Sequence, residues 1–195
     1  MAQYLWNSQF VGAATPGDGT TYLPGSFPRY SPVSGIEGAT PKDLGCCEQL
    51  VEEAFAILLA WMTGLTDSVT YQKIKATVDH IVVSGPATTE RWEEQFGQSP
   101  SSIAAIIAGL VAAADIARQN GDPASAAEWE STADSWRSSL ATRTFTTDGY
   151  FGGHRYYERI DLAQDPNGPQ TLHFDEGDFF AHDVADFGCL DLVRR

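Results

Sequence analysis

The chain has 195 residues, 43% of them hydrophobic, and a formal net charge of −14 from 12 basic and 26 acidic residues. This length fits one domain with a real core. The excess of acidic residues excludes a general affinity for nucleic acid and for anionic membrane surfaces. No stretch reaches the ~18 uncharged apolar residues of a membrane-spanning helix. Residues 1–10 lack the basic start of a signal peptide.

The first half of the chain predicts three helices and one long loop. A short helix is expected at 2–12, followed by a loop over 13–46 that is rich in Gly, Pro, Ser and Thr. A helix at 47–63 is apolar on all faces, which indicates burial, and Gly64 follows it as a C-terminal cap. The next helix, at 68–84, carries one apolar stripe and is therefore expected at the surface.

A second pair of helices follows with the same alternation. Ser99 and Pro100 are a typical helix start, and the segment 101–114 that they introduce holds no charge. We therefore expect a second buried helix at 99–120. The helix at 122–141 has one apolar stripe and is expected to face water on its other side.

The last part of the chain changes character. Residues 144–151 predict a β-hairpin on an Asp-Gly turn, 155–160 a short strand, and 165–169 a loop. A final helix is expected at 183–195, with no terminating signal. The expected organisation is a single, incomplete domain: loop-rich at 13–46, helical hairpins at 47–142, loop and strand at 143–182, and a truncated helix at 183–195.

Buried helices alternating with amphipathic ones are typical of stacked helical hairpins. The buried helices at 47–63, 99–120 and 183–195 would form an inner layer, with 68–84 and 122–141 outside. The fold class is therefore all-α, with a small β excursion near 144–160. The hairpins can close into a toroid or continue as an open solenoid. An incomplete array would leave inner helices exposed, so self-association through them is expected.

Acidic and aromatic residues gather at, or just before, the start of each predicted inner helix. They lie within 48–53, in the segment ERWEEQFG at 90–97, and within 175–180. Parallel inner helices would bring these segments to one end of the fold. Aromatic rings stack on sugar faces and carboxylates accept hydroxyl hydrogens, and two carboxylates are the usual means of cleaving a glycosidic bond. The sequence therefore points to a carbohydrate site.

Each acidic segment also has a plainer interpretation. Glu52 and Glu53 would complement the dipole at a helix start. Asp175, Glu176 and Asp178 would form a solvated loop. The run from Trp92 to Glu94 has no packing need for its second acid, and here the functional and structural interpretations stay equally open.

A metal site is the chemical alternative. His173, Asp175 and His182 are the residue types of a non-haem iron site, but that class needs a β-sandwich that the sequence does not predict. No metal and no other cofactor is expected. Cys46 and Cys47 are adjacent, and with Cys189 they show no zinc spacing. Thiols, a vicinal disulfide or a link to another partner all stay open.

The segment TTERWEEQFGQSPSSIAAIIAGLVAAADIA, from Thr88 onwards, resembles the glucoamylase and glucodextranase family, glycoside hydrolase family 15. The likeness extends back through GSFPR at 25–29 and through 48–61, and forward through DVADFGCLDLV at 183–193. Most of the chain is covered, and Arg-Trp-Glu-Glu-Gln is its most specific part.

This resemblance implies an (α/α)6 toroid and inverting hydrolysis of α-glucosidic bonds from the non-reducing end of α-glucans. It implies that Glu93 is the general acid, that Trp92 and Glu94 contact substrate, and that Gln49 is a further sugar contact. It also implies that the full-length parent is secreted. An α-glucan or oligosaccharide is the expected partner.

Two family segments are not matched. The Trp-x-Arg-Asp segment that binds the terminal glucose would precede Met1, and the catalytic base would follow Arg195. We therefore expect a fragment from the middle of a catalytic domain that is inactive by itself. Two alternatives stay open: a helical-hairpin module that binds a partner or oligomerises without catalysis, and a trehalase-like hydrolase of the same fold.

Overall fold

The structure is a computed structural model that describes residues 2–13, 21–27, 49–174 and 177–185. Five α-helices are present in this part of the chain: α1 (Ala2–Ser8), α2 (Leu50–Thr63), α3 (Ser68–Ser84), α4 (Pro100–Gln119) and α5 (Pro123–Thr144). The four long helices confirm the predicted ones to within three residues at each end. The predicted helix at 2–12 is shorter than expected, because the backbone of Phe10 bonds to Gly25 and Ser26.

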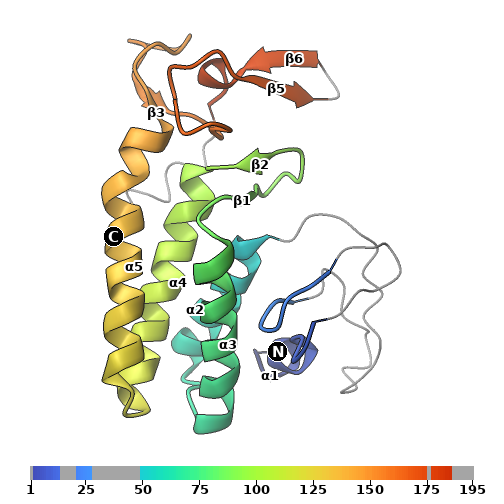
Figure 1. The fold of residues 1–195 in the computed structure, drawn as a ribbon, viewed down its shortest axis with the longest axis vertical. Helices are drawn as coiled ribbons and strands as arrows, with labels where there is room; N and C mark the ends of the chain where they lie inside the picture. Colours follow the sequence, from blue (N-terminus) through green and yellow to red (C-terminus); the bar gives the residue numbers. More distant parts are fainter. Residues whose placement is uncertain (1, 14–20, 28–48, 175–176, 186–195) are drawn as a thin grey trace.

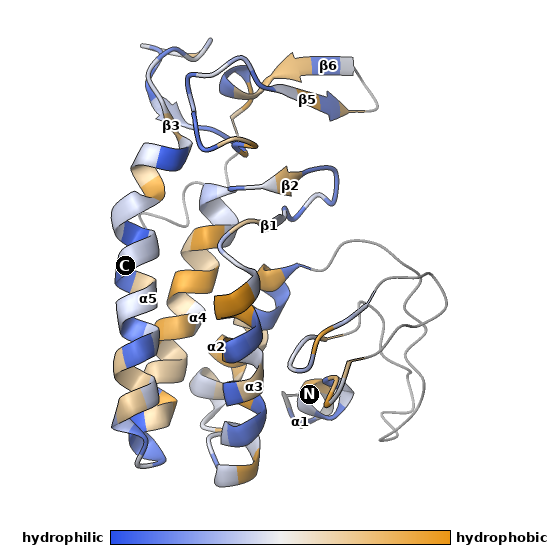
Figure 2. Ribbon diagram, in the orientation of Figure 1, coloured by the Kyte–Doolittle hydropathy of each residue, from blue (hydrophilic) through white to orange (hydrophobic). Residues whose placement is uncertain are grey.

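The long helices form two antiparallel hairpins, α2 with α3 and α4 with α5 (Figure 1). α2 and α4 run in the same direction and pack directly on each other. α4 is apolar along most of its length, whereas α5 is mostly polar (Figure 2). The predicted alternation of inner and outer helices is therefore confirmed for these four helices.

The core lies where α2, α4 and the inward stripes of α3 and α5 meet. Gly109 of α4 allows a close approach to α2, since a Cβ there would lie 2.9 Å from the Cβ of Ala54. Ser99 and Pro100 begin α4 as predicted, but the side chain of Ser99 makes no capping hydrogen bond. Gly64 ends α2 as predicted, in the left-handed region at φ 67°. Asp122 caps α5 by accepting a hydrogen bond from the backbone N–H of Ser125. The largest buried core side chains are Trp6, Ile57, Ile74, Ile81, Ile106, Leu110, Ile116 and Trp129.

α2 is not buried on all faces, contrary to the prediction. Phe55, Trp61 and Met62 are exposed. Its buried residues pack against α1, α3 and α4, while these three side chains remain exposed. The uniform apolarity of 47–63 therefore did not indicate burial all round.

Glu53 also differs from its expected role as a helix-dipole partner. Its carboxylate is buried, and Oε2 lies 2.9 Å from Nδ1 of His80 on α3. Ser84 lies 3.2 Å from the other ring nitrogen of His80. The pair links α2 to α3, so a polar contact that the sequence did not indicate sits between these helices.

Among the described helices, α4 has the length and hydropathy that could also span a membrane, with a mean hydropathy of 1.8. However, 72% of that stretch is buried inside the protein. Since α4 packs between α2 and α5, its apolar surface is explained by the core.

Short antiparallel strand pairs lie at one end of the helices (Figure 1). In the described residues these are β1 (Thr88–Thr89) with β2 (Phe96–Gly97), β3 (Phe145–Thr146) with β4 (Tyr156–Tyr157), and β5 (Thr171–Phe174) with β6 (Gly177–Phe180). The last pair was not predicted. It places Asp178, expected in a solvated loop, in a strand.

The predicted hairpin within 144–151 is wrong, because the first of its two strands pairs with a later segment. β3 pairs with β4, not with Tyr150 and Phe151. Asn167 accepts a 2.8 Å hydrogen bond from the backbone N–H of Thr147. The rings of Phe145 and Tyr157 meet edge to face at 5.1 Å. Pairing within 144–151 would forgo both contacts.

The predicted helix at 183–195 does not begin at Asp183. Ala181–Asp183 form a single 3-10 turn, and Val184 is extended. Its carbonyl accepts a hydrogen bond from the backbone N–H of Arg159, which holds this segment away from a helical path. Residues 186–195 lie outside the described residues, as do Cys46, Cys47 and Cys189 and most of the 13–46 loop.

Candidate functional site

α2 and α4 begin at the same end of the molecule, next to the β1–β2 hairpin and below the β5–β6 hairpin (Figure 1). Two of the predicted acidic segments are in contact there, since Gln49 bonds to Glu93. From the third segment, 175–180, Phe179 on β6 lines one cavity together with Trp92 and Glu94. The expected convergence is thus confirmed for the described residues, while Asp175 and Glu176 lie outside them.

Residues 90–95, here called the 90–95 loop, connect β1 to β2 and are organised by Glu90. Its buried carboxylate accepts hydrogen bonds from the backbone N–H groups of Trp92 (3.1 Å) and Glu94 (3.2 Å). Its own backbone N–H donates to the carbonyl of Gln95, and its carbonyl accepts from Glu93. Glu90 therefore fixes the path of the loop through both its side chain and its backbone.

Glu93 occupies an unusual backbone conformation in this loop. Its φ is 64°, in the left-handed region that non-glycine residues rarely adopt. Such strain persists only where neighbouring contacts enforce it, and it is concentrated at functional sites. The side chain is half-buried, and Oε1 accepts a 2.9 Å hydrogen bond from Nε2 of Gln49 at the start of α2.

Arg159 joins the loop to the β-rich end of the chain. Its Nη2 lies 2.8 Å from Oε1 of Glu90 and 2.5 Å from Oε2 of Glu94. Burial alone would lower the pKa of Arg159, but the hydrogen bonds to the two carboxylates outweigh it and raise this pKa. The negative charge of Glu94 is therefore offset by a fixed cation.

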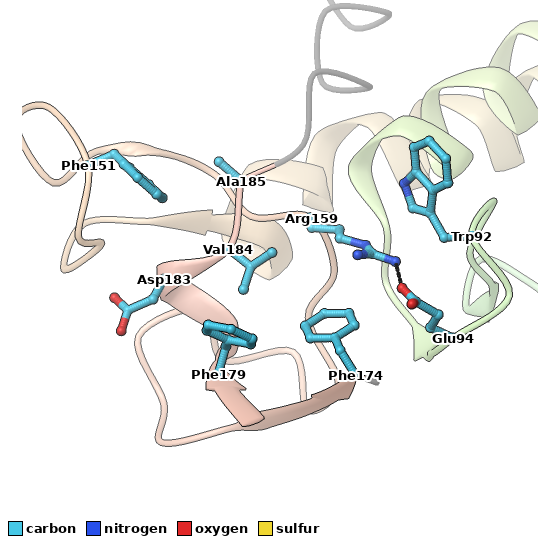
Figure 3. Close-up of a pocket in the computed structure, with 9 residues that line it drawn as sticks. All are labelled: Trp92, Glu94, Phe151, Arg159, Phe174, Phe179, Asp183, Val184 and Ala185. Atoms are coloured by element: carbon cyan, nitrogen blue, oxygen red, sulfur yellow. Dashed lines mark hydrogen bonds and ion pairs between the residues drawn. The ribbon is translucent and has the colours of Figure 1, made fainter. Parts of the chain in front are cut away.

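A cavity of about 860 Å³ opens beside the loop (Figure 3). Its walls include the rings of Trp92, Phe174 and Phe179 and the charged groups of Glu94, Arg159 and Asp183. Ring faces next to carboxylates and a guanidinium suit a polyhydroxylated ring. Glu93 is not in the cavity wall, since its side chain turns toward Gln49.

The residues of the metal alternative do not gather. Nδ1 of His173 lies 2.8 Å from Asp178 across the β5–β6 hairpin, and the ring of His182 stacks on Phe180. Among the described residues, no three His, Cys, Asp or Glu side chains are placed to share an ion. Asp175 lies outside them.

The structure therefore brings Gln49, Trp92, Glu93 and Glu94 to one end of the fold. Sequence reasoning missed Glu90 and Arg159. A local signal existed for Glu90. It lies two residues before Trp92 and four before Glu94, and at these spacings a carboxylate can accept hydrogen bonds from both backbone N–H groups. None existed for Arg159, which reaches the loop from a distant part of the sequence.

Three comparisons place this geometry among known proteins. The family described as glycosyl hydrolases family 15 matches residues 54–172. A curated glucoamylase from Clostridium sp. (strain G0005) is 38% identical over 152 residues, covering 75% of this chain and 21% of that protein. The crystal structure of a bacterial glucoamylase complexed with acarbose matches with a TM-score of 0.79 and 34% identity, over 87% of this chain and 24% of that chain.

These matches confirm the predicted fold class, part of an (α/α)6 toroid of helical hairpins. The chain spans about a fifth to a quarter of the length of these relatives. The family match includes the whole 90–95 loop, whereas Gln49 precedes it.

Proposed function

Since this chain belongs to glycosyl hydrolases family 15, we propose that its 90–95 loop carries the general acid of an exo-acting, inverting α-glucosidase. The enzyme would release glucose from the non-reducing ends of α-glucans. Glu93 is the proposed acid, and Trp92 and Glu94 are the proposed substrate contacts. For Gln49 the resemblance implies a sugar contact, and its bond to Glu93 supports a second role, as a support for the acid. The structural relative bound to acarbose supports an oligosaccharide substrate.

The observation that carries this proposal is the construction of the loop around Glu93. The residue is held in the left-handed region at φ 64°, and a side chain from another element fixes its carboxyl group. In inverting enzymes one carboxylic acid protonates the leaving oxygen, and a second carboxylate activates water ~6.5–9.5 Å away. A fixed acid on a strained loop suits the first of these roles.

The second carboxylate has no counterpart that the resemblance matches in residues 1–195. Negligible turnover by the chain alone therefore stays our prediction, as does a single incomplete domain. The short span of the chain relative to its relatives supports both. An extracellular location of a complete enzyme likewise stays a prediction from the resemblance.

The test uses a hybrid in which this chain replaces its aligned stretch in the Clostridium sp. glucoamylase. Glu93→Gln keeps the shape of the side chain but cannot donate a proton. We expect its kcat on maltose to fall by roughly 100-fold or more. The loss on α-glucosyl fluoride should be much smaller, because fluoride leaves without protonation.

Two matched variants complete this experiment. Glu128→Gln, at an exposed position of α5, should leave both substrates unaffected. Glu94→Gln should raise KM more than it lowers kcat, as expected for a substrate contact. Equal losses on both substrates in Glu93→Gln would show that Glu93 is not the general acid.

A further inference from the structure

We propose that Arg159 is a positioning residue for Glu93, holding the 90–95 loop in its strained path by bridging Glu90 and Glu94. The inference rests on the proposed function only in naming Glu93 as the acid. It adds a residue that neither the sequence patterns nor the resemblance indicated.

The bridge acts on both sides of Glu93. Glu94 follows it directly in the chain and bonds to Nη2 of Arg159 at 2.5 Å. Glu90 bonds to the same nitrogen at 2.8 Å, while its carbonyl accepts a 2.8 Å hydrogen bond from the backbone N–H of Glu93. A single guanidinium nitrogen thus connects the two anchors between which Glu93 is held.

The carboxylate of Glu90 needs this cation because it is buried. Its side chain is 1% exposed, and that of Arg159 is 13% exposed. Removing one member of a buried ion pair leaves an uncompensated charge, which is strongly destabilising. The least costly response is for Glu90 to turn toward water. It would then release the N–H groups of Trp92 and Glu94 and, with them, the conformation of Glu93.

Arg159 is itself held firmly enough to act as an anchor (Figure 3). Its guanidinium lies 4.8 Å from the ring centre of Phe174 on β5 and 5.9 Å from that of Trp92. Two residues along the chain, the backbone of Asp161 exchanges hydrogen bonds of 2.7 and 3.0 Å with Gln98 after β2. The base of the hairpin and its tip are therefore tied to the same short segment.

The test follows the contact between Gln49 and Glu93 by 15N–1H NMR of the full 195-residue chain. The side-chain amide of Gln49 reports on the position of Glu93, since it bonds to Oε1 at 2.9 Å. The backbone amides of Trp92 and Glu94 report on the hydrogen bonds that they donate to the carboxylate of Glu90. Resonances of α4 and α5, together with the melting temperature, report on the fold.

Arg159→Met keeps the aliphatic stem and removes the charge. We expect it to shift the Gln49 side-chain amide and to speed hydrogen exchange at Trp92 and Glu94 by roughly tenfold or more. Arg159→Lys restores a cation and should return these signals toward wild type. The matched control, Arg137→Met, removes an exposed arginine that pairs with Asp134 on α5, and it should leave the loop unchanged.

An unshifted Gln49 amide in folded Arg159→Met overturns the proposal, as do equal shifts in the loop and throughout α4 and α5. Should the Met variant unfold, Lys and Gln at position 159 decide the question. Positioning by charge requires Lys to resemble wild type and Gln to shift the loop, and equal behaviour of the two overturns it.

These readouts require no turnover, so they separate this inference from the proposed function. If Arg159→Met moves the loop but Glu93→Gln loses activity equally on both substrates, Arg159 still positions the loop, and Glu93 is not the acid. If Glu93→Gln distinguishes the substrates and Arg159→Met moves nothing, the acid assignment stands without this anchor.

Discussion

Nε2 of Gln49 donates a 2.9 Å hydrogen bond to Oε1 of Glu93, and this bond joins the residue before α2 to the 90–95 loop. The resemblance assigns Gln49 to the sugar, whereas the structure directs its amide to the proposed acid. The two roles predict different kinetics. Removing a side chain that binds the ground-state sugar raises KM, whereas misplacing the acid lowers kcat.

We expect Gln49→Ala in the hybrid enzyme to lower kcat on maltose by roughly tenfold, the value of about one hydrogen bond. Its KM should change much less. Steady-state kinetics on maltose measure both quantities. Gln119→Ala removes a glutamine that bonds to Asp115 at an exposed site of α4 and serves as the control. A rise in KM at constant kcat would show that Gln49 binds the sugar and does not support Glu93.

Glu158 carries a buried carboxyl group whose ionisation makes the free energy of unfolding depend on pH. Its side chain is 1% exposed, and neither oxygen has a hydrogen-bond partner among the described residues. Burial, followed by the charges of Asp161 and Asp165, raises its pKa from 4.5 to about 9. Burial also raises the pKa of Asp161. The folded chain therefore keeps a proton that the unfolded chain loses as the pH rises above about 4.5.

Since the folded state binds more protons in this window, the free energy of unfolding falls as the pH rises from about 4.5 to about 9. The slope from Glu158 is about 1.4 kcal/mol per pH unit in the middle of the window. Urea denaturation at pH 5, 6, 7 and 8 measures it. Glu158→Gln should flatten the dependence, whereas Glu128→Gln should not. An unchanged slope in Glu158→Gln would mean that Glu158 is ionised in the folded chain.

The helices were predictable because their signals are local. Gly64, Pro100 and Asp122 mark helix ends through the chemistry of single turns, and the apolar stripes of α3 and α5 set their orientation. The pairing of short strands was not predictable in this way. β3 met β4 because of contacts made by Asn167 and Tyr157, which no local pattern encodes.

The candidate site likewise combines a local part that could be predicted with long-range contacts that could not. The motif from Trp92 to Glu94 is contiguous, so a resemblance could find it. Its supports are not contiguous: Arg159 reaches the 90–95 loop from 65 residues beyond Glu94, and Gln49 from 44 residues before Glu93. Glu53 likewise found its partner, His80, on another helix. Long-range polar contacts thus account for the parts of the site and of the helix packing that the sequence alone left undetermined.

Gly109 sets the distance between the two inner helices. A Cβ at this position would lie 2.9 Å from the Cβ and 3.0 Å from the Cα of Ala54. Gly109→Ala should therefore push α4 away from α2. Overpacking costs about 1–3 kcal/mol, against a gain of about 1 kcal/mol in helix propensity.

We expect a net loss of stability in Gly109→Ala, measured by urea denaturation. Gly12→Ala is the control, because nothing lies within 4 Å of a Cβ there, and it should change the free energy of unfolding by less than about 0.5 kcal/mol. A Gly109→Ala chain as stable as wild type would show that α2 and α4 can separate freely.

The inner helices expose large apolar side chains, which predicts self-association of the chain. Phe55 and Met62 on α2 are 52% and 75% exposed, and Val111 on α4 is 49% exposed. Exposed apolar patches favour association when they are contiguous, and α2 and α4 lie side by side. Sedimentation velocity over a range of concentrations should show a mass that rises with concentration.

Charged substitutions on this apolar face test whether the association uses the inner helices. Phe55→Lys with Val111→Lys should restore a monomer, since a charged group resists burial at an apolar contact. Val83→Lys is the matched control, because Val83 is 79% exposed on the outer helix α3 and should leave the association unchanged. A monomeric wild-type chain at every concentration would contradict association through the inner helices, and equal dissociation by Val83→Lys would assign it to general charge repulsion.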